Sequence, residues 1–171
     1  MSKTLLLVNG PMGVGKSAVC RELLERLQPG AYLDGDWCWT TRPFRVTEES
    51  RAMVLDNITA LLSRFLRCSE LDYVIFGWVM HREEIARTLL ARLDLAETQV
   101  ARYTLLCRPE TLRRRIEGDI AAGLRTPEAT DRSLAYLPLY AEQSTIKVMT
   151  DGLTPARIAE RIAGEMKGES L

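Results

Sequence analysis

The apolar run LLLVN leads directly into the octet GPMGVGKS, and this junction constrains the fold more than any other part of the sequence. The octet satisfies G-x-x-x-x-G-K-[ST] without a mismatch and lies between a predicted strand, 4–9, and a predicted helix, 16–27. Gly10, Gly13 and Gly15 let the backbone curl around phosphate oxygens with its N–H groups pointing inward. The junction therefore predicts a phosphate-binding loop between a strand and a helix.

The side chains that follow these glycines suit a nucleoside triphosphate. Lys16 can bridge the β- and γ-phosphates, and the Ser17 hydroxyl can ligate Mg²⁺. The helix that begins near Lys16 adds the positive end of its dipole. A glycine turn that matches by chance is the alternative, and the strand–loop–helix context argues against it. The predicted nucleotide-binding residues of the loop are Gly10, Pro11, Met12, Gly13, Val14, Gly15, Lys16, Ser17 and Ala18.

Size and charge narrow the class of protein. We expect residues 1–171 to form a single domain with a buried core. Basic and acidic residues number 23 each, and a net charge of zero argues against binding to nucleic acid by phosphate neutralisation. Four cysteines without CxxC spacing and one histidine argue against a structural zinc site. Scattered thiols, and apolar runs too short for a membrane span or a signal core, predict a cytoplasmic protein with no membrane partner.

Strand-like and helix-like segments alternate through the whole chain, which predicts a three-layer α/β domain with a five-stranded, mainly parallel sheet. Ligands of such sheets gather at the carboxyl ends of the strands. Strands after the first are predicted at 31–34, 73–80, 100–107 and 145–150. Helices after the first are predicted behind Thr47, over 82–93, from Pro109 to Gly123, from Thr126-Pro127 to a break at Pro138, and behind Thr154-Pro155.

Two aspartates follow the second predicted strand, in the segment DGDWCW. Asp34 and Asp36 flank Gly35, so their carboxylates can converge on the phosphates. One can hold a water of the Mg²⁺ shell, and the other can accept the proton of an acceptor hydroxyl. A simple turn is the alternative, because Asp and Gly are favoured turn formers. The expected place of the pair, where a second substrate must approach, favours a functional role.

The phosphate loop on the first strand, the D-x-D after the second and an arginine-bearing segment between the fourth and fifth strands resemble the small P-loop kinases. That group includes shikimate kinase, gluconate kinase, chloramphenicol phosphotransferase and, more distantly, nucleoside monophosphate kinases. Around DGDW, FGWVMH and RTPE…RS the chain is most similar to an uncharacterised branch of AAA-type nucleotide kinases. The tunicamycin-resistance ATP-binding protein family has a comparable layout. The resemblance implies an α/β/α P-loop NTPase fold with strand order 2-3-1-4-5 and a helical lid over about residues 113–144.

The resemblance also implies transfer of the γ-phosphoryl group of Mg·ATP to a small acceptor. Asp36 then becomes the candidate base, and Asp34 lies nearer the metal with Ser17, although the two aspartates could exchange these roles. Many P-loop NTPases end the third strand with an aspartate that supports Mg²⁺, whereas this chain has Gly77, as shikimate kinase does. This departure fits a kinase that uses the aspartates after its second strand, and it counts against a motor or switch ATPase.

Arginines of the predicted lid are candidates for stabilising the transferring phosphoryl group. We expect Arg125 and Arg132 to act in catalysis. For Arg115 two alternatives stay open, a contact with the adenine and an i,i+4 ion pair with Asp119. Asp119 is itself a departure, because many relatives carry an arginine there. The resemblance also places the loop 151–155 near the adenine.

All three tryptophans of the chain follow the second and third predicted strands, close to the expected acceptor. They either stack on a planar acceptor or pack beneath the neighbouring helices. Arg42 is a candidate partner for an acidic group of the acceptor, and His81 a candidate hydrogen-bonding group. The candidate substrate residues are Asp36, Trp37, Trp39, Arg42, Trp78 and His81.

The sequence thus predicts an enzyme that uses ATP and Mg²⁺ to phosphorylate a small molecule, such as a nucleoside, a nucleotide or another hydroxyl compound. A nucleotide-sensing ATPase that acts through a protein partner is the alternative. The missing acid at the end of the third strand counts against this alternative, and the zero net charge counts against nucleic acid as a partner. The identity of the acceptor, the choice between ATP and GTP, and the oligomeric state stay open.

Overall fold

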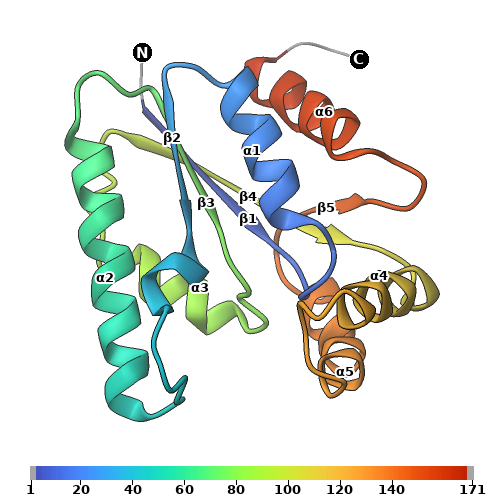
Figure 1. Cartoon of the computed structure of the whole chain (residues 1–171). Helices are drawn as coiled ribbons and strands as arrows, with labels where there is room; N and C mark the ends of the chain where they lie inside the picture. The colour runs from blue at the N-terminus through green and yellow to red at the C-terminus, as the bar shows by residue number, and fades with distance from the viewer. Residues whose placement is uncertain (1–2, 169–171) are drawn as a thin grey trace.

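The computed structural model describes residues 3–168, in which a parallel sheet lies between helices (Figure 1). The strand order is β2-β3-β1-β4-β5, and every pairing between neighbours is parallel. The strands are β1 (Lys3–Asn9), β2 (Gly30–Asp34), β3 (Tyr73–Gly77), β4 (Thr98–Leu106) and β5 (Ile146–Met149). The three-layer α/β fold and the strand order predicted from the sequence are confirmed.

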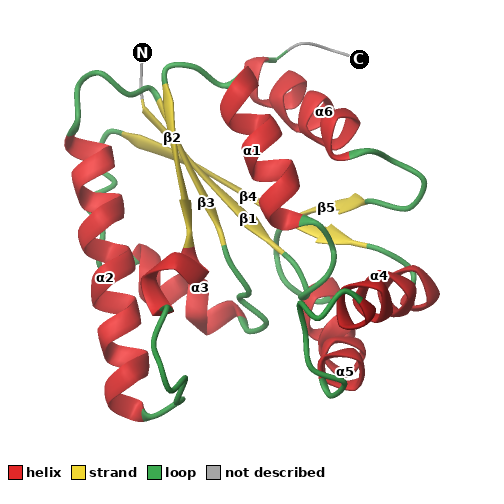
Figure 2. Ribbon diagram, in the orientation of Figure 1, coloured by secondary structure: helices red, strands yellow, loops and turns green. Residues whose placement is uncertain are grey.

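Within residues 3–168, six α-helices and one short 3₁₀ helix connect the strands (Figure 2). One face of the sheet carries α1 and α6, the other carries α2 and α3, and α4 and α5 pack together beyond the end of β1. None of the described helices is long and apolar enough to cross a membrane. The helices are α1 (Lys16–Arg26), η1 (Gly35–Trp39), α2 (Glu48–Arg67), α3 (Glu83–Leu90), α4 (Pro109–Ala121), α5 (Ala129–Ala141) and α6 (Pro155–Lys167).

The central strand β1 explains why the chain begins with a continuous apolar run. Leu6 and Val8 pack into the core beneath α1 and α6, whereas Leu5 and Leu7 pack into the core beneath α2 and α3. Successive side chains of a strand point to opposite faces, so a strand covered on both faces needs apolar residues at every position. The end of β1 is thereby fixed at the centre of the sheet.

Pro138 does not end a helix, contrary to the sequence-based prediction. It lies inside α5, which continues to Ala141. The proline ring removes one backbone donor, and the carbonyl one turn earlier loses its partner. The last turn is held instead by Tyr140, whose side chain is 2% exposed. Burial of this aromatic ring outweighs the loss of one hydrogen bond.

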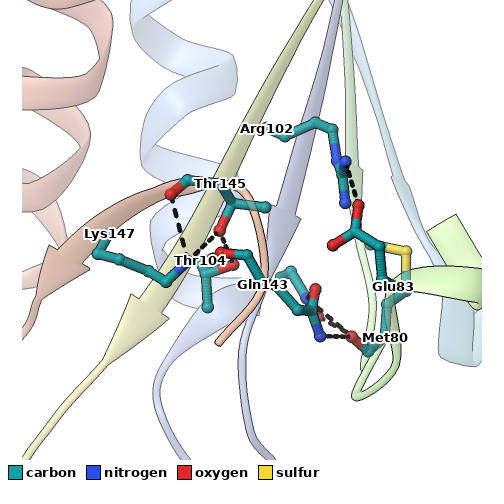
Figure 3. Close-up of polar contacts among 8 residues, drawn as sticks. Met80, Glu83, Arg102, Thr104, Gln143, Thr145 and Lys147 are labelled. Carbon is teal, nitrogen blue, oxygen red and sulfur yellow. Dashed lines mark hydrogen bonds and ion pairs between the residues drawn. The ribbon is translucent and has the colours of Figure 1, made fainter. Parts of the chain in front are cut away.

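A buried network of side-chain amides joins the end of β1 to two distant loops. Asn9 donates from Nδ2 to the Met80 carbonyl and accepts the Met80 N–H on Oδ1, both at 2.8 Å. Gln143, just after α5, donates from Nε2 to the same carbonyl at 2.7 Å (Figure 3). The Asn9 amide also donates to Gln143 Oε1 at 3.0 Å. β3 ends at Gly77 rather than at the predicted residue 80, and the backbone of Met80 pairs with the Asn9 side chain instead of with a neighbouring strand.

Two further sets of polar contacts flank this network (Figure 3). Arg102 of β4 forms an ion pair with Glu83 at the start of α3, with 2.6 Å between Nη1 and Oε1. Lys147 of β5 donates to the Thr145 hydroxyl at 2.8 Å and to the Gln143 carbonyl. The Thr145 hydroxyl in turn lies 2.7 Å from the hydroxyl of Thr104. These contacts anchor α3 and the connection from α5 to β5 on the sheet.

Replacing Asn9 should test how much of the stability this network supplies. The change Asn9→Leu leaves the buried Met80 N–H and the Gln143 amide oxygen without their partners, so we expect the free energy of unfolding to fall by about 2–4 kcal/mol. Urea denaturation measures this loss. The same change at the exposed Asn57, which donates to the Cys38 carbonyl at 3.2 Å, is the control and should cost under about 1 kcal/mol. Equal losses in the two variants would contradict the prediction.

Candidate functional site

The phosphate loop, residues 10–17, connects the end of β1 to the start of α1, as predicted. Gly10, Gly13 and Gly15 have φ angles of 145°, 85° and 104°, a region that side chains disfavour. A Cβ atom on Gly13 would also lie 2.6 Å from Cγ1 of Ile116 in α4. Glycine is therefore needed both for the curl of the loop and for its close packing under α4.

Lys16 is folded over its own loop. Its ammonium group donates to the carbonyls of Gly10 and Pro11 at 2.8 and 2.9 Å. Loss of solvation lowers the pKa of Lys16 to about 8, although the nearby Asp36 carboxylate acts in the opposite direction. Phosphate oxygens at this place would restore a favourable environment for the charged amine. The loop and its lysine are thus arranged to bind an anion.

Asp34, at the end of β2, receives hydrogen bonds on both carboxylate oxygens. Oδ2 accepts the hydroxyls of Ser17 and Tyr32, each at 2.8 Å. Oδ1 accepts the N–H of Asp36 at 3.1 Å and so caps η1. The structure therefore brings Asp34 and Ser17, the two predicted metal ligands, into direct contact.

Asp36 faces the same space from the first turn of η1. Burial raises the pKa of this carboxyl, and the negative charge of Asp34 raises it further, while Lys16 and a hydrogen bond from Trp78 act against the shift. A carboxylate with a raised pKa takes up a proton more readily than an ordinary one. A general base stays the predicted role of Asp36.

These groups meet in one pocket of about 400 Å³. It combines the phosphate loop with the aspartates after β2, the end of β3 and the start of the predicted lid. Gly77, Val79 and Asp119 line the pocket without being among the predicted site residues, although the sequence predicts that the segment 77–81 lies at this edge of the sheet. The lining residues are Met12, Gly13, Gly15, Lys16, Ser17, Ala18, Asp34, Asp36, Gly77, Trp78, Val79, Arg115, Asp119 and Arg125.

Of the three tryptophans, Trp78 lines the pocket. A Cβ atom on Gly35 would lie 2.4 Å from Cγ of Trp78, so the glycine between the two aspartates lets this indole approach the backbone. Trp37 is 56% exposed and packs edge-on against the ring of Tyr32, with ring centroids 5.3 Å apart. Trp39 lies on the core beneath α2. Trp39 therefore packs beneath a helix, which is one of the two alternatives left open by the sequence. Stacking on an acceptor stays a prediction for Trp78.

Arg42, His81 and Arg132 are not among the residues that line the pocket. Arg42 is exposed in the connection between η1 and α2. The imidazole of His81 stacks on the ring of Tyr136 in α5, with centroids 4.7 Å apart and an interplanar angle of 12°. Arg132 is exposed on α5. The structure therefore does not bring these three predicted site residues to the phosphate loop.

The lid arginines have different partners from those expected. Arg125 lines the pocket and pairs with Asp119, with 2.7 Å between Nε and Oδ2. The predicted alternative pair of Arg115 with Asp119 is wrong, because Arg115 donates from Nη1 to the Val14 carbonyl at 3.0 Å and to the Thr150 hydroxyl at 2.9 Å. Arg115 thereby ties α4 to the phosphate loop and to the end of β5. Its contact with an adenine stays a prediction.

The oxygen ligands of the pocket suit Mg²⁺. The hydroxyl of Ser17 and the carboxylate of Asp34 are hard donors 2.8 Å apart. No group of three or more His, Cys, Asp or Glu side chains within residues 3–168 could hold a metal ion. Mg²⁺ at nucleotide sites commonly takes one or two protein oxygens and completes its shell with water and phosphate. The donor set fits an ion that arrives with a nucleotide.

The sequence matches the family of AAA domains over residues 6–130, and the chain belongs to this family. No curated protein matches the sequence significantly. Solved structures share the fold over nearly the whole chain. The tunicamycin resistance protein of Deinococcus radiodurans is 21% identical, with a TM-score of 0.72 and coverage of 99% of this chain and 98% of that chain.

Two kinases have the same fold. A gluconokinase from Sinorhizobium meliloti is 19% identical, with a TM-score of 0.67 and 99% of each chain covered. A shikimate kinase from Acinetobacter baumannii, solved in complex with shikimate, is 20% identical, with a TM-score of 0.66 and coverage of 99% of this chain and 96% of that chain. The predicted resemblance to the small P-loop kinases is therefore confirmed at the level of the fold.

The lowered pKa of Lys16 predicts that nucleotide binding takes up a proton. At about pH 9 most Lys16 side chains are neutral in the free protein, whereas bound phosphates favour the charged form, so binding should take up close to one proton per site. At about pH 7 the amine is already charged and the uptake should be small. Calorimetric titration with ATP in two buffers of different ionisation enthalpy measures this uptake.

Two lysine variants separate Lys16 from the other titrating groups. Lys16→Met should remove the proton uptake that accompanies binding. Lys147 is the control, because burial also lowers its pKa but it does not line the pocket, so Lys147→Met should behave as the wild type. Undiminished uptake in Lys16→Met would show that another group takes the proton.

Proposed function

We propose that this chain is a kinase that transfers the γ-phosphoryl group of Mg·ATP to a hydroxyl group of a small molecule. The observation that carries the proposal is the convergence of two carboxylates on the phosphate loop. Asp34 touches Ser17, while Asp36 stands beside Lys16 with a raised pKa. One carboxylate thus suits a metal and the other suits a proton. A site that only bound nucleotide would have no need of the second group.

The donor half of the reaction uses the phosphate loop. Backbone N–H groups of the loop and the Lys16 ammonium bind the β- and γ-phosphates, and Lys16 exchanges its two carbonyl partners for phosphate oxygens. Ser17 and Asp34 would hold Mg²⁺, which when bound neutralises charge on the phosphates. Arg115, which already contacts the carbonyl of Val14, keeps the loop closed beneath the lid.

The acceptor half of the reaction uses Asp36. A hydroxyl oxygen of the acceptor attacks the γ-phosphorus, the bond to the bridging oxygen breaks, and ADP leaves with the bonding electrons. The hydroxyl proton passes to the Asp36 carboxylate. Trp78 and Val79 form the wall that the acceptor would contact. An acceptor that is itself a phosphate would need no base, and Asp36 would then only orient it.

Arg125 supplies positive charge from the lid. Its guanidinium pairs with Asp119 in the structure and lines the same pocket as Lys16. As charge builds up on the transferred group, the guanidinium can turn from the Asp119 carboxylate to the phosphoryl oxygens. Asp119 would therefore hold the arginine at the pocket until a nucleotide is present.

A screen of ATP consumption across an acceptor library tests the proposal directly. The library should hold nucleosides, nucleotides, sugars and hydroxy acids, with Lys16→Ala as the inactive control. We expect at least one acceptor to raise the rate of ADP formation well above the rate without acceptor. Hydrolysis that no acceptor accelerates would favour the alternative of an ATPase acting through a protein partner.

Asp36→Asn should separate nucleotide binding from turnover. We expect kcat with the acceptor from this screen to fall by about 10² to 10⁴, because the amide cannot accept the hydroxyl proton. The affinity for Mg·ATP should change by less than about threefold, since the change is isosteric. Asp56→Asn is the matched control, because Asp56 is exposed and pairs with Arg92 far from the pocket lining. An unchanged kcat would remove Asp36 from the mechanism.

The two candidate lid arginines should differ in their effect on turnover. Arg125→Ala removes a guanidinium that lines the pocket, and we expect kcat to fall by about 10² to 10³. Arg132→Ala removes an exposed side chain outside the lining, and we expect a change below about threefold. Steady-state kinetics measure both. Equal losses would mean that the lid brings Arg132 to the phosphates during the reaction.

A further inference from the structure

The carboxyl end of β3 has a glycine beside the metal-binding groups. Gly77 pairs in register with Asp34 of β2 on one side and with Val8 of β1 on the other. The carboxylate of Asp34 must therefore pass over β3 to reach Ser17 at the start of α1, which it contacts at 2.8 Å. A residue with a long side chain at position 77 would stand beside this path.

The space beside Gly77 is taken up by two side chains. A Cβ atom on Gly77 would lie 2.9 Å from the sulfur of Cys20. It would also lie 3.5 Å from Cε2 and 3.6 Å from the hydroxyl oxygen of Tyr32. A side chain at position 77 would therefore clash with the sulfur of Cys20, and its first atom would already be in contact with the phenol of Tyr32.

The hydroxyl of Tyr32 reaches the oxygen of Asp34 that Ser17 also contacts. Both hydroxyls donate to Oδ2 at 2.8 Å, while Oδ1 is held by the N–H of Asp36. When the Ser17 hydroxyl turns its oxygen toward a metal ion, the bond from Tyr32 is left to orient Oδ2. A phenol carries its proton at neutral pH, and a carboxylate can only accept, so the Tyr32 hydroxyl is the donor in this bond.

We propose that Tyr32 is a positioning residue that holds the Asp34 carboxylate in the orientation needed for Mg²⁺. Gly77 leaves the sulfur of Cys20 and the phenol of Tyr32 packed against the backbone of β3, and the tyrosine provides the hydrogen bond to Asp34. The carboxylate that would support the metal thus comes from Asp34 on β2, and Gly77 on β3 supplies none. The inference rests on the proposed function only in that Mg²⁺ accompanies the nucleotide into this pocket, and it does not depend on the acceptor.

The effect of Mg²⁺ on nucleotide affinity tests this role. Calorimetry gives the dissociation constant of a non-hydrolysable ATP analogue with excess Mg²⁺ and with a chelator, and the ratio of the two is the metal enhancement. For Tyr32→Phe we expect this enhancement to fall by about 10-fold, because a group that orients a metal ligand has lost its hydrogen bond. The dissociation constant in the presence of chelator should stay as in the wild type. Asp34→Asn is the reference for loss of the ligand itself.

Tyr103→Phe is the matched control. The Tyr103 hydroxyl also donates to a carboxylate, that of Glu165 at 3.2 Å, and its ring is likewise packed in the core. Neither residue lines the pocket. We expect the metal enhancement of this variant to equal that of the wild type. A fall as large as that of Tyr32→Phe would assign the effect to packing and would overturn the inference.

Gly77→Ala gives a second measurement at the same place, whether or not Tyr32→Phe folds. The added methyl group meets the sulfur of Cys20 and the ring of Tyr32, so we expect the metal enhancement to fall here too, by about 10-fold. A Gly77→Ala, Cys20→Ala double variant lacks the sulfur that the added methyl group would meet, so it should recover part of the metal enhancement.

Three further results would overturn the inference. They are an undiminished metal enhancement in Tyr32→Phe, an equal loss of affinity with Mg²⁺ and with chelator, and a wild type that shows no metal enhancement. The acceptor screen stands apart from these outcomes. A protein that binds nucleotide with Mg²⁺ but phosphorylates no acceptor would refute the proposed kinase and leave the role of Tyr32 intact.

Discussion

The hydrogen bond between Ser17 and Asp34 joins the phosphate loop to the segment that follows β2. In the sheet, β3 lies between β2 and β1. The bond from Ser17 at the start of α1 to Asp34 at the end of β2 therefore crosses the end of β3, and it needs a passage there that no side chain of β3 blocks. Gly77 leaves that passage open. The start of α1 and the end of β2 can then act on one ligand, and the position of Asp36 follows from the cap that Asp34 provides to η1.

Charge in the pocket is balanced before any ligand enters. The Lys16 ammonium is held by backbone carbonyls, the Arg125 guanidinium by Asp119, and Asp34 by hydroxyl and N–H donors. Each of these partners can be exchanged for a phosphate oxygen or a metal ion at small cost, because hydrogen bonds are replaced rather than lost. Asp36 is the exception, because burial and the nearby charge of Asp34 raise the pKa of its carboxyl more than Lys16 and Trp78 lower it. This is the property that suits it to take up a proton.

Local patterns in the sequence were enough to predict the fold and to place the phosphate loop and the two aspartates at one edge of the sheet. The apolar run of β1, the glycine loop and the Asp34–Asp36 pair each lie within a few consecutive residues, and alternation of elements determines where strand ends meet. Contacts between distant segments could not be predicted this way. Examples are the bond from Tyr32 to Asp34 and the bonds from Arg115 to Val14 in the phosphate loop and to Thr150 after β5.

The clamp formed by Asn9, Met80 and Gln143 limits what the lid can do. It fastens the far end of α5 to the centre of the sheet, while Arg115 fastens α4 to the phosphate loop. With both helices anchored, a hinge that swings them as one body would have to break buried hydrogen bonds. Freedom is left to the short connection 122–128, which carries Arg125. Closure of the predicted lid would therefore involve this connection of a few residues rather than a movement of α4 and α5.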